Sequence, residues 1–273
     1  MKKELKLNRE DNDYLALAEA SLFAEDRLVF LPQVDSTNEE AHRLALQGAG
    51  EGTAVIADQQ TAGRGRRGRS WYSDSSGGLY LSLLLRPGFA PDRASMITLV
   101  AALAVSQAIE EVCGLKTAIK WPNDLLLSEK KVCGILTQLH MAEEKIDSLI
   151  VGIGINVNQK NFPQDIQAVA TSLQIELGEP VEKDKLLSSL LICFEKKYRE
   201  FLLHENLSSL QTEYNARLIS RGRQVRVAGT LQELSGEALG INEAGELLVK
   251  REDGLVEAVY AGEVSVRGIY GYV

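Results

Sequence analysis

A run of arginines and glycines is the strongest chemical signal in the sequence. Residues 63–69 read Gly-Arg-Gly-Arg-Arg-Gly-Arg, so four basic side chains fall within six positions of a chain whose net charge is −8. Arginine offers a fixed charge and two parallel N–H donors to phosphate or carboxylate, and glycine lets the backbone approach a ligand closely. The segment therefore predicts a loop that binds an anion and closes over it. The alternatives are a solvated basic loop and a nucleic-acid patch, for which only Trp71 and Tyr72 offer nearby stacking.

The same run matches the glycine pattern of a dinucleotide-binding site, but the residues after it do not. That site needs a helix directly behind the glycines, whose N-terminus meets the pyrophosphate. Residues 70–78 read Ser-Trp-Tyr-Ser-Asp-Ser-Ser-Gly-Gly, which does not begin a helix. The pattern G-x-x-x-x-G-K-[ST] does not occur in the sequence either. A Rossmann site and a P-loop are therefore excluded.

A second motif, Lys-Trp-Pro-Asn-Asp at residues 120–124, ends a predicted strand with a cation, a rigid turn, an amide and a carboxylate. The cation could bind a substrate oxygen, and the carboxylate could hold a metal ion or orient an attacking amine. An ordinary turn is the alternative, since proline, asparagine and aspartate all favour turns.

Two further motifs place glycines inside strand patterns. Residues 131–136 read Lys-Val-Cys-Gly-Ile-Leu, and residues 152–157 read Gly-Ile-Gly-Ile-Asn-Val. Glycine within a strand indicates a bulge or the close approach of a ligand to the backbone. Asn156 carries an amide that could bind an adenine edge. The alternatives are a plain strand with an exposed Lys131 and a simple bulge.

These motifs must be positioned by helices and strands. The predicted helices are segregated from the strands along the chain, which favours an α+β fold over a doubly wound sheet. Ser36 and Glu39 have the spacing of a capping box, which predicts a helix from there to about Gln47. Two more helices are predicted over 92–112 and 183–218, and a loop over 59–78. Strands are predicted over 28–31, 53–57, 79–85, 116–120, 132–139 and 148–157.

The pattern changes after Ile219, where five short β-prone runs separated by turns predict a small barrel. The runs cover 223–228, 237–242, 246–250, 256–260 and 263–267. We therefore expect a catalytic domain over 1–219, with a short helical extension at 1–26, and a barrel domain over 220–273.

Composition excludes several classes of protein. The chain has 273 residues, of which 45% are hydrophobic and 25% charged, as in a globular domain. Its 38 Asp+Glu against 30 Lys+Arg argue against bulk nucleic-acid binding. No leader pattern follows Met1, and no apolar run reaches the roughly 18–20 residues of a membrane span. Three widely spaced cysteines are typical of reduced thiols, so a cytoplasmic protein without a membrane partner or a structural zinc site is expected.

These motifs, together with Ser36-Thr37-Asn38 and Gln60, occur in the same order as the motifs of a known family. They resemble those of the biotin protein ligases, the biotin–[acetyl-CoA-carboxylase] ligases. The resemblance covers about residues 28–270. The resemblance implies a catalytic domain similar to class II aminoacyl-tRNA synthetases, followed by an SH3-like barrel. It implies that ATP and Mg²⁺ activate biotin as biotinyl-5′-AMP. A lysine on the biotin carboxyl carrier domain of acetyl-CoA carboxylase or pyruvate carboxylase would then take the biotinyl group.

Some members of this family carry an N-terminal DNA-binding domain. Because residues 1–26 are too few for such a domain, we expect a single-function ligase that does not bind DNA. Apolar strand edges make a homodimer possible without deciding it.

The resemblance also assigns site residues. Catalytic roles fall to Arg66, Lys120, Asp124 and Lys131. Contacts with biotin fall to Ser36, Thr37, Asn38, Gln60, Gly63, Arg64, Gly65, Arg66, Trp71 and Lys131. Contacts with ATP fall to Arg66, Arg69, Trp71, Lys120, Asn123 and Asn156. It assigns no dedicated metal ligands, although Asp124 could assist Mg²⁺, and Arg267 in the barrel could reach the nucleotide phosphates.

Two alternatives stay open. One is a lipoate or octanoate ligase on the same fold, and the other is a non-catalytic biotin- or RNA-binding module. The arginine loop and the Lys-Trp-Pro-Asn-Asp turn favour biotin, and the presence of Lys120, Asp124 and Lys131 beside that loop favours an enzyme.

Overall fold

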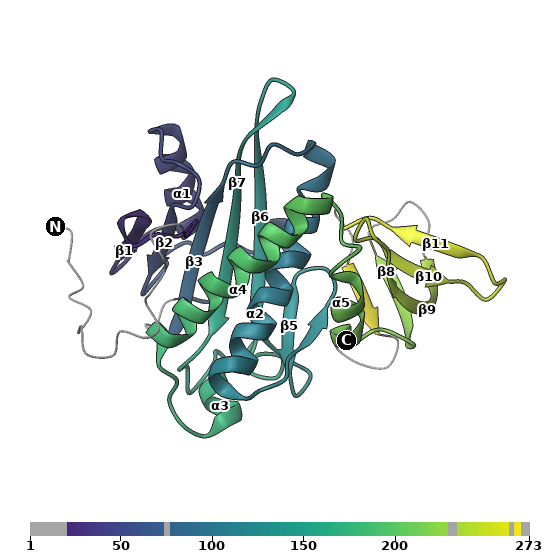
Figure 1. Cartoon of the computed structure of the whole chain (residues 1–273). Helices are drawn as coiled ribbons and strands as arrows, with labels where there is room; N and C mark the ends of the chain where they lie inside the picture. Colours follow the sequence, from purple (N-terminus) through teal and green to yellow (C-terminus); the bar gives the residue numbers. More distant parts are fainter. Residues whose placement is uncertain (1–20, 74–76, 229–233, 262–264, 269–273) are drawn as a thin grey trace.

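A seven-stranded mixed sheet forms the larger part of the chain in the computed structural model, which describes residues 21–73, 77–228, 234–261 and 265–268 (Figure 1). The strand order is β1-β2-β3-β7-β6-β5-β4. The first pair is parallel and the other neighbours are antiparallel. The strands are β1 (Leu28–Leu31), β2 (Ala54–Ala57), β3 (Gly78–Leu85), β4 (Ala118–Lys120), β5 (Asp124–Leu127), β6 (Lys130–Ala142) and β7 (Lys145–Asn156).

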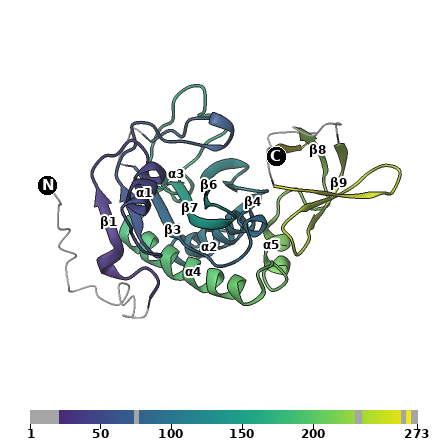
Figure 2. The same ribbon diagram turned by 90° about the horizontal axis from the view of Figure 1, so that it is seen from above.

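Helices cover both faces of this sheet (Figures 1 and 2). For this reason all eight residues of β3 are buried. On one face, α2 (Met96–Cys113) and α4 (Lys183–His204) pack on the main hydrophobic core. On the other, α1 (Thr37–Leu46) packs on a smaller cluster that includes Leu84 and Ile150. With the turn before it, α2 is long and apolar enough to cross a membrane, but 72% of its most apolar 18-residue window is buried inside the protein, as in a core helix.

A second, five-stranded antiparallel sheet lies at the C-terminal end of the chain. Its order is β11-β10-β9-β8-β12. Trp121 at the end of β4 donates its indole N–H to the carbonyl of Gly245 over 3.0 Å, which joins the two sheets. The strands are β8 (Gln224–Ala228), β9 (Leu234–Ile241), β10 (Leu247–Lys250), β11 (Val256–Val259) and β12 (Ser265–Gly268).

The α+β prediction is confirmed, but the predicted helix over 183–218 is wrong because it is two helices. The first, α4, ends at His204, where Glu205 takes a left-handed φ of 50° and its N–H closes on the carbonyl of Phe201. The second, α5 (Gln211–Arg217), starts after a turn. Apolar residues recur in both helices, so the periodicity of the sequence alone does not show that the helix ends between them.

Three smaller differences concern short elements. Strand β5 and the five-residue helix α3 (Leu173–Leu177) are missing from the sequence prediction. Ser36 is the N-cap of α1, but its side chain makes no capping hydrogen bond, so the capping-box prediction is wrong in its chemistry. Of the predicted helical extension, residues 1–20 lie outside the described residues, and Glu25–Arg27 form a single 3₁₀ turn.

Candidate active site

A small polar cavity lies where the N-terminus of α1, the arginine loop and strands β6 and β7 meet. Sequence-predicted residues from four separate segments line it. They are Ser36, Thr37, Asn38, Gln60, Arg64, Gly65, Arg66, Trp71, Asn123 and Lys131. Backbone and side chains of Gly134, Ile135, Leu136, Gly152, Ile153 and Gly154 complete the lining. The fold therefore brings together motifs that lie more than a hundred residues apart in the chain.

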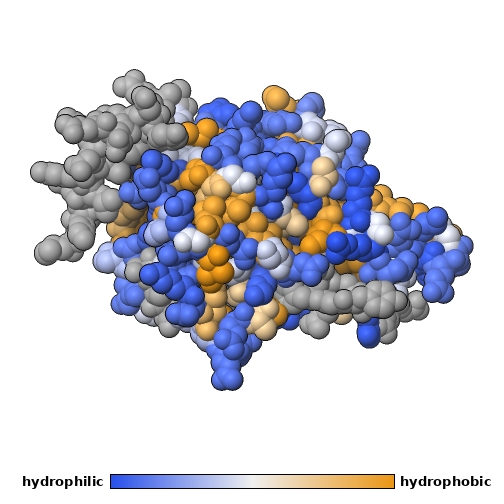
Figure 3. All heavy atoms as spheres, turned by 90° about the horizontal axis from the view of Figure 1, so that it is seen from below, coloured by the Kyte–Doolittle hydropathy of each residue, from blue (hydrophilic) through white to orange (hydrophobic). Residues whose placement is uncertain are grey.

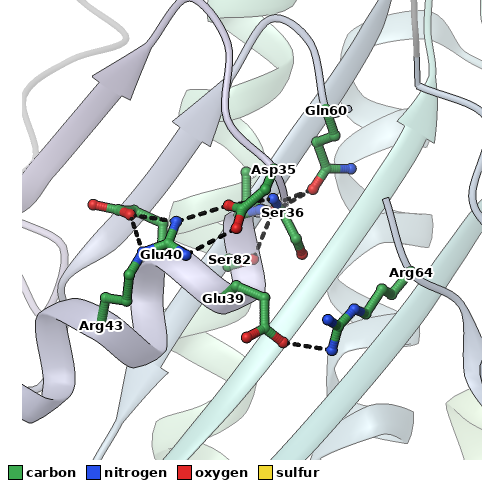
Figure 4. A network of polar contacts seen from close by, with 9 residues as sticks. Asp35, Ser36, Glu39, Glu40, Arg43, Gln60, Arg64 and Ser82 are labelled. Atoms are coloured by element: carbon green, nitrogen blue, oxygen red, sulfur yellow. Dashed lines mark hydrogen bonds and ion pairs between the residues drawn. The ribbon is translucent and has the colours of Figure 1, made fainter. Parts of the chain in front are cut away.

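A hydrogen-bond network forms the α1 side of this cavity, and Figure 4 shows the part that involves Gln60 and Ser82. Gln60 Oε1 accepts from the backbone N–H of Thr37 over 2.8 Å. Ser82 Oγ lies 2.7 Å from Thr37 Oγ1 and 2.6 Å from Asn38 Oδ1. Asn38 Nδ2 in turn donates to Gln138 Oε1 over 2.6 Å. These contacts fix the amide of Asn38, because its oxygen faces a hydroxyl and its nitrogen faces a carbonyl oxygen.

Sequence reasoning missed Ser82 and Gln138. Ser82 is fully buried in the middle of β3, between leucines, and Gln138 lies on the same face of β6 as Gly134 and Leu136. A hydroxyl inside an otherwise apolar strand was the available signal, since a buried polar group needs a partner.

The strand glycines make room for side chains of the protein itself. A Cβ on Gly152 would collide with the Asn38 side chain. A Cβ on Gly154 would lie 2.7 Å from Trp71 Nε1, and one on Gly134 would lie 2.8 Å from Trp71 Cζ3. The expected close approach at these glycines is therefore real, but Asn38 and Trp71, which line the cavity, are the groups that approach.

The arginine loop is an ordered turn rather than an open coil. Gly65 N–H donates to the carbonyl of Arg69 over 2.7 Å, and Arg64 pairs with Ser70 in an isolated antiparallel bridge. Arg67 has a left-handed φ of 59° at the tip. Arg64 forms an ion pair with Glu39 on α1 at 2.7 Å (Figure 4). Arg66–Gly68 form a single 3₁₀ turn, and no helix follows over residues 69–73, the part of this segment that the structure describes, as the sequence indicated.

A chain of polar contacts connects the loop to the catalytic candidates. Arg66 Nη1 donates to Asn123 Oδ1 over 2.8 Å, and Asn123 Nδ2 donates to Asp124 Oδ1 over 2.9 Å. The same carboxylate oxygen lies 2.7 Å from Lys131 Nζ, in an ion pair whose side chains are 18% and 24% exposed. Burial lowers the pKa of Arg66 below its ordinary value, against the opposing effect of the Asp124 carboxylate. Arg66, Lys131 and Asp124 thus place two cations and one carboxylate together, partly withdrawn from water.

A second and larger cavity, of about 360 Å³, begins where the first ends. Trp71 and Lys131 line both cavities, and Asn156 lines the second together with Tyr72 and Phe162. Tyr72 and Phe162 meet edge to face, with ring centroids 6.4 Å apart. The remaining lining includes Pro163, Ile166, Val169 and Ala170. Aromatic and aliphatic walls of this kind suit a flat heterocyclic ring.

Asn156 is held by the backbone. It is 4% exposed, and its Nδ2 donates to the carbonyls of Thr171, over 3.0 Å, and of Lys131, over 3.4 Å.

The side of the molecule on which α3 lies carries apolar residues in a band across its middle, framed by hydrophilic ones (Figure 3).

Four predicted residues, Lys120, Asp124, Arg69 and Gly63, are absent from the lining of these two cavities. Lys120 ends β4 opposite Asp124 in the strand register. Arg69 is exposed on the outer side of the loop. Gly63 is buried against Ser73 and the carbonyl of Trp71, where it supports the loop. The Arg267 side chain lies outside the described residues.

The first cavity has a volume of only about 50 Å³. One water molecule takes about 30 Å³ in the liquid, and pockets for small ligands span about 300–1,000 Å³. The first cavity is therefore smaller than a typical pocket for a small ligand.

An ATP-dependent acyl-transfer enzyme of the biotin and lipoate ligase class fits this fold and this site. Residues 30–156 match the Biotin/lipoate A/B protein ligase family, and residues 221–267 match the Biotin protein ligase C terminal domain. The chain is similar to the Bifunctional ligase/repressor BirA of Bacillus subtilis, at 39% identity over 88% of this chain and 74% of the relative. It is also similar to the Biotin–[acetyl-CoA-carboxylase] ligase of Paracoccus denitrificans, at 33% identity over 87% of this chain and 100% of the relative.

Among solved structures, the biotin protein ligase from Aquifex aeolicus in complex with biotin and ATP has a TM-score of 0.78 and 36% identity. The match covers 88% of this chain and 98% of that structure. This chain belongs to the biotin protein ligase family, and the family prediction is confirmed.

Proposed function

We propose that this enzyme activates biotin with ATP as biotinyl-5′-AMP and transfers the biotinyl group to a lysine of a biotin carboxyl carrier domain. The observation that carries this proposal is the continuity of the two cavities. A polar pocket meets a larger apolar one, and Lys131 lines both of them beside the Asp124 carboxylate and the arginine loop. Relatives named as biotin–[acetyl-CoA-carboxylase] ligases support acetyl-CoA carboxylase as the source of the acceptor domain.

The two cavities suggest where each substrate binds. Biotin would enter the smaller cavity, with its polar ring against the Asn38 and Thr37 network and its carboxylate toward Lys131. ATP would place its base against Tyr72 and Phe162, with the α-phosphate toward Lys131 and Arg66. Both cations would then lie where the two substrates meet, which orients them and neutralises their charges.

The reaction would proceed in two steps. A biotin carboxylate oxygen attacks the α-phosphorus of ATP, and the bond from that phosphorus to the bridging oxygen breaks as pyrophosphate leaves. The neutral amine of the acceptor lysine then attacks the acyl carbon, an amide bond forms, the amine loses a proton, and AMP leaves. Asp124 lies beside Lys131 and is placed to orient that amine or to receive its proton. Arg66 would stabilise the negative charge on the α-phosphate in both steps.

Magnesium belongs to the proposal as a partner of ATP. Mg²⁺ is usually bound by one or two carboxylates together with substrate phosphates. Asp124 is the carboxylate beside this site, and no group of three His, Cys, Asp or Glu suited to a metal occurs among the residues that the structure describes. The residues present therefore suit a metal ion that arrives with the nucleotide, whose charge it would neutralise.

Several finer features belong to the proposal as well. We propose that the large sheet is of the class II aminoacyl-tRNA synthetase type and that the C-terminal sheet closes as an SH3-like barrel, which its five short antiparallel strands support. A pyruvate carboxylase domain as acceptor and a homodimer, with no DNA partner, are also proposed. The free thiols of Cys113, Cys133 and Cys193 support a cytoplasmic location.

Pyrophosphate–ATP exchange tests the first step. The purified protein is incubated with Mg²⁺ and ATP and with biotin, lipoate, octanoate or no acid. Exchange with biotin alone supports the proposal, and exchange with another acid would show that the enzyme is a ligase for that acid. Absence of exchange in folded protein would refute the proposal and favour a binding module. Mass spectrometry of an added carrier domain then tests transfer.

A further inference from the structure

Asn123 occupies the junction between the arginine loop and the Lys131–Asp124 ion pair. It lies in the turn between β4 and β5, directly after Pro122. Its Oδ1 accepts from Arg66 Nη1 over 2.8 Å. Its Nδ2 donates to Asp124 Oδ1 over 2.9 Å and to the carbonyl of Ile135 over 3.2 Å. Its own carbonyl accepts from the N–H of Ile135 over 2.9 Å, which fixes the turn against β6.

These partners determine which way the amide faces. An asparagine side chain has two hydrogens to donate, and both are used, one by a carboxylate and one by a carbonyl. Its oxygen faces the guanidinium of Arg66. A flipped amide would place its NH₂ group against a cation and its oxygen against an anion, so the observed orientation is the only one that satisfies all three groups. A direct contact from this NH₂ group to ATP would require at least one of these bonds to break.

Arg66 has a second anchor in the other sheet. Its Nη2 donates to the carbonyl of Ala261, just beyond β11, over 3.2 Å. The indole of Trp121, two residues before Asn123, donates to the carbonyl of Gly245. The turn and the loop are therefore both bound to the C-terminal sheet, and Asn123 connects them to each other. In this arrangement the guanidinium is held over the cavity before a substrate arrives.

We propose that Asn123 is a positioning residue that holds Arg66 closed over the cavity and couples it to the Lys131–Asp124 pair, so that the acyl-adenylate is retained until the acceptor arrives. The proposal rests on the proposed function. It adds a positioning role to the predicted contact of Asn123 with ATP. An acyl phosphate reacts with water and with free amines, so an arginine held in place over it protects the intermediate.

The first test compares Asn123→Ala with Asn158→Ala. Asn158 is a matched control because its side chain also makes two hydrogen bonds, both to Val181, but lies outside the lining of both cavities. Each enzyme is loaded with biotin and ATP, separated from free ligand, and followed as the adenylate is released. We expect release about ten-fold to a hundred-fold faster from Asn123→Ala, the effect of losing one charge-assisted hydrogen bond. The KM for ATP should change less than about two-fold.

Release at the wild-type rate, or an effect confined to the KM for ATP, would overturn the proposal. A carboxylate at the same position then distinguishes positioning from simple loss of contact. Asn123→Asp keeps an oxygen for Arg66 but places a second carboxylate beside Asp124, and two neighbouring carboxylates do not ionise independently. We expect this variant to retain the adenylate better than Asn123→Ala, and its exchange activity to gain a new pH dependence. Retention and a pH profile identical to those of Asn123→Ala would count against the role.

A third measurement uses no substrate and no catalysis. Hydrogen exchange is followed at the amides of Gly65 and Arg69, which form backbone hydrogen bonds that close the loop. We expect faster exchange in Asn123→Ala than in wild type or Asn158→Ala, with global stability measured alongside. Unchanged exchange would overturn the proposal even if the wild-type enzyme made no adenylate. A wild-type enzyme without adenylate, in turn, would refute the proposed function separately.

Discussion

Lys131 is the residue whose replacement tests the site most directly. Its ammonium lies 2.7 Å from Asp124 Oδ1 and 5.1 Å from the centre of the Trp71 ring. It lines both cavities, so the proposed function places it against the biotin carboxylate and the α-phosphate together. Lys131→Ala removes this charge and leaves the carboxylate of Asp124 without its ion-pair partner.

The loss of reaction rate and the loss of stability expected for Lys131→Ala can be compared. Removing one preorganised charged or hydrogen-bonding group from a transition state costs about 10²–10³ in rate, or about 3–4 kcal/mol. Breaking a fully buried ion pair costs about 3–5 kcal/mol of stability, but this pair is 18% and 24% exposed, so about 1–3 kcal/mol is expected. A protein of ordinary stability, about 5 kcal/mol or more, that loses about 2 kcal/mol stays more than about 99% folded. Unfolding therefore cannot account for a hundred-fold loss of activity.

The assay is biotin-dependent pyrophosphate–ATP exchange, with urea unfolding measured on the same preparations. Lys130→Ala is the matched control because Lys130 is the neighbouring lysine in β6 and is exposed. We expect Lys130→Ala to exchange at the wild-type rate and Lys131→Ala to lose at least about a hundred-fold. Folded Lys131→Ala that exchanges within about three-fold of wild type would refute the assignment of this lysine to the reacting phosphate.

Three further changes have defined outcomes. Arg66→Gly should leave stability nearly unchanged but release the adenylate, detected as biotin on lysines of an added bystander protein; full retention would contradict the role of Arg66. Gly154→Ala places a methyl group 2.7 Å from Trp71 Nε1, so biotin affinity measured by calorimetry should fall about ten-fold, whereas Gly88→Ala, where nothing lies within 4 Å, should bind normally. Burial, with a neighbouring histidine, lowers the pKa of His140. The unfolded chain therefore takes up more protons as pH falls through about 6.5, and the free energy of unfolding should decrease there. His140→Gln should show a smaller decrease between pH 7.5 and 5.5, and an equal decrease would show that other groups cause it.

The sequence located the chemistry better than it located the geometry. The order of motifs was enough to predict the family, the α+β fold and most of the lining of the first cavity. It could not show that Gly134 faces Gly154, because that pairing depends on the register of β6 and β7. Once the register is known, Trp71 has a defined place over both glycines. A sequence marks a glycine as unusual but does not say which side chain takes the space beside it.

Long-range contacts explain why the sequence does not show the partners of Asn123 and Ser82. The resemblance assigns Asn123 to ATP, and the structure adds partners that the sequence does not show: Arg66, 57 residues earlier in the chain, and Ile135 in the next strand. The sequence marks Ser82 only as a hydroxyl among apolar residues of one strand, which does not show what it binds. Its role becomes visible only when α1 places Thr37 and Asn38 against it. In each case a buried polar atom is satisfied by a partner that only the fold supplies.

The four arginines of the loop are equivalent in composition, but the turn gives them different surroundings. Arg67 and Arg69 are exposed, and Arg64 is bound to the carboxylate of Glu39, which offsets its charge. Arg66 is only partly exposed, donates to the oxygens of Asn123 and Ala261, and places its positive charge at the lining of the first cavity. Because burial already disfavours that charge, as its lowered pKa shows, an anion that enters the cavity relieves the cost of desolvation. We therefore expect Arg66, rather than the loop as a whole, to attract and hold the phosphate.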